Sequence, residues 1–227
     1  DAQAKGYAEK DPTADIEGYD ACRKIAILTS LVCGQQVDFE DIHTEGITHI
    51  SATDIKYAKA MGRAIKLLAT SKKTDGGYVA MVAPFLLPKE HPLYNVNGVF
   101  NAIFVRGNVL GDAMFYGSGA GKLPTASAVV ADVVDEAKHL HKNIMTNWSS
   151  KPLELIPMDE VEGRFFVRVE GTTVDQVEAV FDDVEIVNLK NLPGEFGFIT
   201  TKMKQGEYKE KVQKLNGSVV TMIRVKD

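Results

Sequence analysis

The sequence predicts an α+β protein in which helices cover a mixed or antiparallel sheet, followed by a small ferredoxin-like unit of order βαββαβ. Three observations predict this fold. Apolar residues recur at helical spacing in the first third of the chain. The middle third holds β-branched and aromatic runs that glycine and proline interrupt. After a polar stretch with two prolines, the end of the chain alternates short strand and helix patterns.

The composition is that of a globular protein with one large domain or two modest ones. Of the 227 residues, 44% are hydrophobic and 25% are charged, which is enough apolar material for a core and excludes a disordered chain. The net charge is −5, so the chain lacks the basic excess that nucleic-acid binding requires. Because no apolar run could span a bilayer and no signal-peptide pattern opens the chain, we expect no membrane partner.

The two cysteines, Cys22 and Cys33, fall on one predicted helix. Their spacing separates the Cα atoms by roughly 16 Å at a helical rise of about 1.5 Å per residue. A disulfide needs Cα atoms within about 7 Å of each other, so the two cannot pair within the chain. We therefore expect free thiols in a reducing, cytoplasmic environment.

The first third of the chain predicts two helices. The first covers 18–33, with Asp15 as its N-cap. A connector with short extended pieces follows over 37–50. The second helix covers 52–69 after Ser51, because five apolar residues recur there at helical spacing. These residues are Ile55, Ala58, Met61, Ile65 and Leu68.

The middle third predicts three strands and a return to helix. The strands cover 78–87, 98–107 and 109–117, and Asn108 forms a hairpin turn between the last two. A helix over 124–144 follows. Its expected packing positions are Val129, Val133 and Leu140.

The C-terminal region predicts four short strands and two helices in the order of a split βαβ unit. The expected elements are strand 164–171, helix 173–183, strand 184–190, strand 196–203, helix 207–215 and strand 218–226. A hairpin through 192–195 joins the second and third strands.

Asp20 and Lys24 lie four residues apart, and therefore on one face of the first predicted helix. Spacing alone favours an exposed ion pair of little energetic weight. Two features favour a functional pair instead. Lys24 stands between apolar neighbours, and a partly buried lysine beside a carboxylate is a common proton donor or acceptor. Acidic residues also gather just before the helix: Glu9, Asp11, Asp15 and Glu17.

A glycine-rich segment, GSGAGKLPT at 117–125, lies between a predicted strand and a predicted helix. It is not a Walker A loop, because Tyr116 and Leu123 stand where that motif needs Gly and Ser or Thr. It also lacks the βαβ context of a dinucleotide fingerprint. Two interpretations remain equally supported: an anion-binding turn at a helix N-terminus, and a plain strand-to-helix turn.

The five histidines show no metal-ligand spacing, and we expect no metal site. His139 and His141 stand two residues apart on a predicted helix and so point to different sides. No Cys–His or Ser–His–Asp arrangement follows from the linear spacing either.

Four segments together resemble homoserine dehydrogenase. They are GYAEKDPTADIEGYDACRKIAIL at 6–28, EGITHISATDIKYAKAMGRAIKLLA at 45–69, HPLYNVNGVFNAIF at 91–104 and FYGSGAGKLPTASAVVAD at 115–132. The C-terminal unit resembles an ACT domain, an amino-acid-sensing module. The resemblance implies a substrate-binding and dimerisation domain over 1–146, incomplete at its N-terminus, then a linker over 147–157 and an ACT-like domain over 158–227.

The resemblance implies NAD(P)-dependent interconversion of L-homoserine and L-aspartate 4-semialdehyde, in threonine, methionine and isoleucine biosynthesis. Lys24 matches the family's proton-donating lysine, and Gly121 matches its cofactor-contacting glycine. Glu9 and Asp20 match the homoserine-binding acids, with Asp15 nearby in the same motif. The family binds NADP or NAD mainly through a preceding nucleotide-binding domain. We therefore expect this chain to be a C-terminal fragment, inactive alone, of a homodimer or higher homo-oligomer.

The resemblance to an ACT domain has one departure. After the first strand that family has an acidic residue and Pro-Gly-Val-Leu, whereas this chain runs from Gly171 directly into Thr172 and Thr173. The shortened loop argues against feedback by threonine and for a mainly oligomerising or residual regulatory role. Two alternatives remain. One is a non-enzymatic, amino-acid-binding regulatory protein, and the other is a different dehydrogenase with another acid cluster around Lys24.

Overall fold

The computed structural model describes residues 10–190 and 192–226, and the chain forms two compact units. One unit comprises Thr13–Lys89 and Trp148–Asp227, and we call it the sheet unit. The other comprises Asp1–Pro12 and Glu90–Asn147, and we call it the hairpin unit. One unit boundary lies at the start of the segment for which we expected a linker. The division into a substrate domain, a linker and an ACT-like domain stays a prediction.

The sheet unit is built from two stretches of chain. The first holds α1 (Thr13–Ile16), α2 (Tyr19–Cys33), β1 (Gln35–Gln36), β2 (His43–Thr44), α3 (Ala52–Ala60), β3 (Arg63–Thr74) and β4 (Gly77–Pro88). The second holds β7 (Ser149–Pro152), β8 (Glu162–Glu170), α5 (Val174–Phe181), β9 (Val184–Val187), β10 (Glu195–Thr200), β11 (Met203–Lys204), α6 (Gln205–Val212) and β12 (Ser218–Val225).

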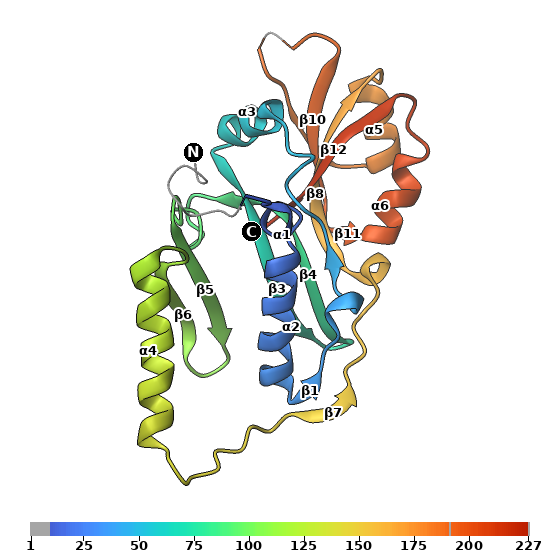
Figure 1. Ribbon diagram of the computed structural model, residues 1–227. Helices are drawn as coiled ribbons and strands as arrows, with labels where there is room; N and C mark the ends of the chain where they lie inside the picture. The colour runs from blue at the N-terminus through green and yellow to red at the C-terminus, as the bar shows by residue number, and fades with distance from the viewer. Residues whose placement is uncertain (1–9, 191, 227) are drawn as a thin grey trace. The chain divides into compact units, whose positions relative to one another are not determined.

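One mixed sheet runs through both stretches (Figure 1). Its strand order is β2-β4-β12-β8-β10-β9, with β3 paired to β4 and β11 paired to β8. β12 joins the two stretches, because it runs parallel to β4, with Arg224 opposite Phe85 and Val225 opposite Leu86, and antiparallel to β8. The predicted α+β fold with a mixed sheet and covering helices is confirmed.

The second stretch follows the predicted βαββαβ order, and we call β8 to β12 the C-terminal module. Its sheet order β12-β8-β10-β9 places the fourth strand beside the first, then the third and the second. Helices α5 and α6 cover one face of these strands (Figure 1). Alternation along β8 sets the two faces, since Phe165 and Val167 pack under these helices, whereas Phe166 packs with Tyr57 of α3 on the opposite face.

The prediction of one helix over 52–69 is wrong for its second half. Helix α3 begins with a capping box at Ser51 and ends at Ala60, and residues 63–74 form strand β3 instead. Gly62 adopts a φ of 66°, a left-handed conformation that terminates the helix. From there the chain pairs with β4 in an antiparallel hairpin that turns at Asp75 and Gly76. Long-range pairing with a buried strand outweighs the helical spacing of Ile65 and Leu68.

The expected N-cap is also wrong. Helix α2 has the predicted extent, but its N-cap is Gly18, with a φ of 78°, whereas Asp15 lies within the short helix α1. At the other end Gly34 adopts a φ of 70°, and its N–H donates to the Ser30 carbonyl.

The hairpin unit contains β5 (Phe100–Gly107), β6 (Gly111–Ser118) and α4 (Lys122–Lys138). The two strands form the predicted antiparallel hairpin. Helix α4 ends before the predicted position 144, and its expected packing positions are wrong. Val129, Val133 and Leu140 are 58%, 63% and 67% exposed. Among the described residues, no helix has both the length and the apolar character needed to cross a membrane.

Candidate functional site

The acidic segment before α2 folds into a tight corner, which we define as residues 13–20. Helix α1 makes a single turn, in which the Glu17 N–H donates to the Thr13 carbonyl at 2.9 Å. The left-handed Gly18 then redirects the chain, and its carbonyl accepts the first hydrogen bond of α2, from Cys22 N–H at 2.9 Å. Asp15 is exposed, and both Asp15 and Asp20 belong to this corner of the sheet unit. Glu9 lies outside the described residues.

Asp20 and Lys24 form the predicted pair at the start of α2. The Lys24 Nζ lies 2.5 Å from Asp20 Oδ2. The Lys24 side chain is 66% exposed and that of Asp20 is 47% exposed. The expectation of a partly buried lysine, based on its apolar neighbours, is therefore wrong. α2 turns its opposite face to the core, where Cys22, Ile25 and Ala26 pack. An exposed ion pair contributes little to stability, which leaves these two charges available to a ligand.

Apolar side chains continue the exposed face of α2 beyond Lys24. Ile27, Leu28 and Leu31 are 52%, 37% and 48% exposed. They follow Lys24 at helical spacing, so they lie on the same side of the helix. The charged pair therefore stands at the end of an apolar surface of the sheet unit.

A buried polar cluster close to the corner escaped the sequence analysis. Arg224 of β12 is 5% exposed, and its Nη1 and Nη2 donate to the two carboxylate oxygens of Glu45, both at 2.8 Å. Nη2 also donates to Gln205 Oε1 at 2.8 Å, and His43 Nε2 lies 2.6 Å from Glu45 Oε1. No signal in the linear sequence joins Arg224 to Glu45. They meet because β3 pairs along one edge of β4, so that β2 and β12 share the other.

The cluster fixes the charge of Glu45. Burial alone acts to raise the pKa of its carboxyl group. The hydrogen bonds and positive charges of His43 and Arg224 outweigh that effect and lower the pKa to about 2. Glu45 is therefore ionised at neutral pH.

Gly121 belongs to the hairpin unit, whereas Asp20 and Lys24 belong to the sheet unit. It follows β6 as the N-cap of α4, with φ 121° and ψ 148°, a conformation that only glycine adopts readily. No side chain caps this helix N-terminus. Earlier in the same loop, the Gly119 N–H donates to the Val99 carbonyl at 2.9 Å. The segment is thus the strand–glycine–helix turn described from the sequence, and both interpretations of it remain open.

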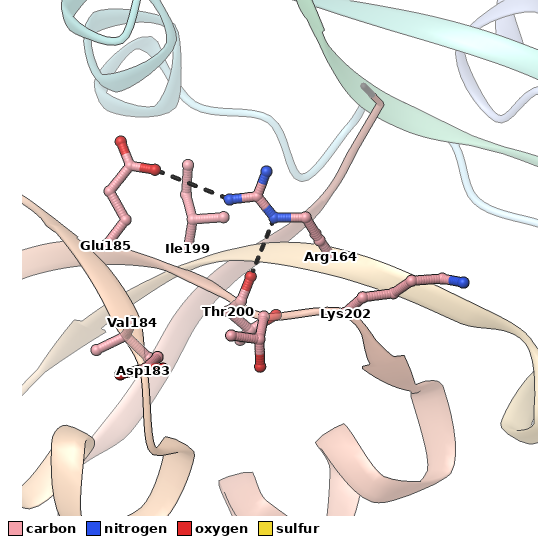
Figure 2. A pocket seen from close by; sticks show the side chains of 8 residues that line it. Arg164, Asp183, Val184, Glu185, Ile199, Thr200 and Lys202 are labelled. Carbon is pink, nitrogen blue, oxygen red and sulfur yellow. Dashed lines mark hydrogen bonds and ion pairs between the residues drawn. The ribbon is translucent and has the colours of Figure 1, made fainter.

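A shallow pocket lies in the C-terminal module, and Figure 2 shows its lining side chains. Arg164 of β8 spans it, with Nε donating to the Thr200 carbonyl at 3.3 Å and Nη2 lying 3.8 Å from Glu185 Oε2. Lys202 pairs outside the pocket with Glu162 at 2.6 Å. The pocket is at the opposite end of β8 from the shortened loop at Gly171, so that loop does not line it.

No group of three or more His, Cys, Asp or Glu side chains in residues 10–190 and 192–226 is arranged to hold a metal ion. Cys22 and Cys33 are both free, as their spacing predicts.

Comparison with known proteins identifies the family. The family model of homoserine dehydrogenase matches residues 1–134. A homoserine dehydrogenase of Neisseria gonorrhoeae is 41% identical over 79% of this chain and 44% of its own length. One of Bacillus subtilis is 33% identical over 95% of this chain and 54% of its own length. The chain thus spans about half the length of the curated relatives that it matches.

The solved structures agree. A homoserine dehydrogenase of Thiobacillus denitrificans superposes with a TM-score of 0.85 at 31% identity, covering 100% of this chain and 57% of that one. A homoserine dehydrogenase of S. aureus gives a TM-score of 0.79 at 29% identity, covering 99% of this chain and 57% of that one. The match by family model, sequence and structure shows that this chain belongs to the homoserine dehydrogenase family.

Proposed function

We propose that this chain supplies the amino-acid-binding part of an oxidoreductase that interconverts L-homoserine and L-aspartate 4-semialdehyde with NADP or NAD. The observation that carries the proposal is the exposed Asp20–Lys24 pair directly after the acidic corner, within a family whose members are named for this reaction. The biosynthetic context is that of threonine, methionine and isoleucine.

Lys24 is the proposed catalytic residue. In the reducing direction the carbonyl carbon of the semialdehyde accepts a hydride, and its oxygen takes up the proton that the Lys24 ammonium donates. Asp20, in contact with Lys24, holds the ammonium in position. Glu9 supplies a carboxylate for the α-ammonium group of the substrate, Asp20 is a second substrate-binding acid, and Asp15 lies nearby in the same motif.

The N-terminus of α4 fits part of a nicotinamide cofactor, which when bound supplies the hydride. Gly121 has no side chain to hinder a close approach, and the uncapped helix N-terminus favours polar or anionic groups. We propose that Gly121 contacts the cofactor and that most cofactor contacts come from the additional length of the full-length relatives. The choice between NADP and NAD follows from those other contacts.

We further propose that the C-terminal module is ACT-like and serves mainly in oligomerisation or residual regulation of a homodimer or larger homo-oligomer. The ferredoxin-like strand order supports the relationship. The short loop at Gly171 supports a module without threonine feedback. Saturable binding of threonine in isothermal titration calorimetry would contradict this part of the proposal.

The deciding experiment compares NADPH oxidation with aspartate 4-semialdehyde by the 227-residue chain and by a protein of the relatives' full length that contains it, which we call the full-length enzyme. We expect turnover by the full-length enzyme and none by the chain alone. Absence of turnover in both, with NADPH and with NADH, would contradict the proposal and favour an amino-acid-binding regulatory protein.

A further inference from the structure

The loop after β2 leaves no space between itself and the acidic corner. A Cβ atom on Gly46 would lie 2.4 Å from the Ile16 carbonyl oxygen and 2.6 Å from the Glu17 Cα, both of which are backbone atoms. The next residue, Ile47, donates its N–H to the same Ile16 carbonyl at 2.7 Å. The backbone of the loop therefore packs directly against the backbone of the corner, so the position of the loop determines the position of α1.

A second contact fixes the corner at the start of α2. Gly18 is buried with a φ of 78°, and a Cβ atom there would lie 3.0 Å from Val82 Cγ1 and 3.5 Å from the Glu45 carbonyl oxygen. Gly18 caps α2, so this contact sets where the helix begins and where Asp20 and Lys24 stand. The corner is thus held from two sides by Val82 of β4 and by the loop that Glu45 begins.

The C-terminal module holds that loop in place. Arg224 grips both carboxylate oxygens of Glu45, and Gln205 at the start of α6 fixes the guanidinium in turn. The Glu45 backbone N–H also donates to the Val82 carbonyl at 2.8 Å. A continuous series of contacts therefore runs from α6 and β12, through Glu45 and Gly46, to the acidic corner.

We propose that Arg224 is a positioning residue for the amino-acid substrate: its bidentate contact with Glu45 lets the C-terminal module set the geometry of the corner that carries Asp15, Asp20 and Lys24. The inference rests on the proposed function, since it assigns the corner to substrate binding. The module contributes no group to the substrate in this arrangement. It acts through the loop, and a change in its packing at β12 alters substrate affinity.

The planar guanidinium is what the contact requires. An arginine presents two parallel donors to one carboxylate and further donors to a neighbour, which fixes the orientation of the carboxylate. A lysine provides the same charge from a single point. Arg224→Lys therefore tests orientation separately from charge, and Glu45→Gln tests charge with the shape of the side chain kept.

The experiment measures steady-state kinetics of the full-length enzyme carrying Arg224→Lys, Arg224→Gln or Glu45→Gln. We expect KM for aspartate 4-semialdehyde to rise about fivefold or more, the usual scale of coupling between sites. KM for NADPH should stay within about twofold of wild type, because Gly121, the residue proposed to contact the cofactor, belongs to the other unit. The matched control is Lys202→Gln, which removes a positive charge from an exposed ion pair in the same module.

Hydrogen exchange supplies a readout that does not depend on activity. The backbone amides of peptides covering 13–24 should exchange faster than in wild type in the Arg224 and Glu45 variants. In Lys202→Gln their exchange rate should equal that of wild type. Unchanged exchange in 13–24 would overturn the inference, and so would equal increases in KM for both substrates. If wild type shows no turnover, the proposed function fails, while the exchange data still decide whether Arg224 positions the corner. If the Arg224 variants fail to fold, Glu45→Gln decides alone.

Discussion

Lys24 is the side chain on which the proposed proton transfer depends. Its ammonium group is exposed and forms an ion pair with Asp20. It is therefore accessible to the oxygen of a bound substrate while Asp20 keeps it in position. We expect Lys24→Ala to lower kcat of the full-length enzyme at least about a hundredfold, the usual scale of general acid catalysis. Initial rates with saturating aspartate 4-semialdehyde and NADPH measure the effect.

The control for this substitution is Lys56→Ala, which removes another exposed lysine from a helix of the same unit. It should leave kcat within about twofold of wild type, as surface substitutions away from the chemistry do. Near-wild-type turnover in Lys24→Ala would remove Lys24 from the mechanism.

The lowered pKa of Glu45 predicts how the stability of the fold depends on pH. Its pKa is lowered from 4.5 to about 2 in the folded protein, so the ionised carboxylate stabilises the fold above the unfolded pKa of 4.5. This contribution declines as the pH falls from 4.5 towards 2. At pH 7 we expect Glu45→Gln to lower the free energy of unfolding by about 2 kcal/mol, the usual contribution of hydrogen bonds to charged groups.

Urea unfolding of wild type and Glu45→Gln at pH 7, 5, 4 and 3 checks this prediction, with the difference between the two proteins as the readout. The difference should shrink steadily below about pH 4.5, because the unfolded chain then protonates Glu45 while the folded protein keeps it ionised down to about pH 2, so that folding must release this proton. A difference that stays constant from pH 7 to 3 would show that Glu45 is not held in its ionised form.

The sequence could predict the Asp20–Lys24 pair but not its surroundings. Spacing by four residues is a local property of a helix, and it places the two charges together in any fold. The exposure of Lys24 depends on which face of α2 packs against β3 and β4. Because α2 carries apolar residues on both faces, the sequence does not show which face is buried. The contact between Arg224 and Glu45 is longer in range still, because it exists only once β2 and β12 lie on the same edge of β4.

At the scale of single elements, the junction of β6 and α4 makes a prediction for cofactor binding. Gly121 has a φ of 121°, and any other residue there is strained by about 1–3 kcal/mol. We expect Gly121→Ala to shift the turn and to raise KM for NADPH about tenfold, with KM for aspartate 4-semialdehyde close to wild type. Steady-state kinetics of the full-length enzyme measure both constants.

Gly117→Ala is the matched control, because it adds the same methyl group to the same glycine-rich segment, at the end of β6. A Cβ atom at Gly117 would meet no atom within 4 Å, and its φ is not in the left-handed region. Both KM values should therefore stay near wild type in that variant. Equal effects of the two substitutions would show that the loop, and not the conformation of Gly121, determines cofactor affinity.

Elements were predictable where local and long-range forces agree. α2 has the predicted extent because its apolar face and the stop at Gly34 agree with its packing. β3 was missed because its apolar residues at helical spacing continue the pattern of α3 across Gly62. The Asp75–Gly76 turn and the long apolar run of β4 were the signals for a hairpin, and they determine the outcome once β4 is buried.

At the scale of the whole molecule, the order of elements in the C-terminal module was predictable, but its union with the first stretch was not. The βαββαβ order follows from short periodic segments, and the structure shows it. The parallel pairing of β12 with β4 joins segments that are far apart in sequence. A pattern of separate periodic segments indicates two sheets as readily as one, so the continuous sheet is a property of tertiary packing.

This continuity predicts that the sheet unit unfolds as one. Phe85, Leu86 and Leu87 of β4 are 7%, 0% and 0% exposed, and Ile223 and Val225 of β12 pack in the same cluster as Leu86. Removing the C-terminal module takes away a hydrogen-bonded neighbour of β4 and exposes several large apolar side chains, at about 1.5–3 kcal/mol each. That loss is comparable to the whole stability of a typical domain.

We therefore expect a chain ending at Pro157 to lack a cooperative thermal transition, whereas the 227-residue chain shows one for the sheet unit. Far-ultraviolet circular dichroism and calorimetry of the two chains, at matched concentrations, measure the difference. If the chain ending at Pro157 melts cooperatively at a temperature close to that of the longer chain, the first stretch forms a complete core without β12. The contact of Arg224 with Glu45 would then bind two independent folding units, and the module would be an accessory of the sheet and not a part of it.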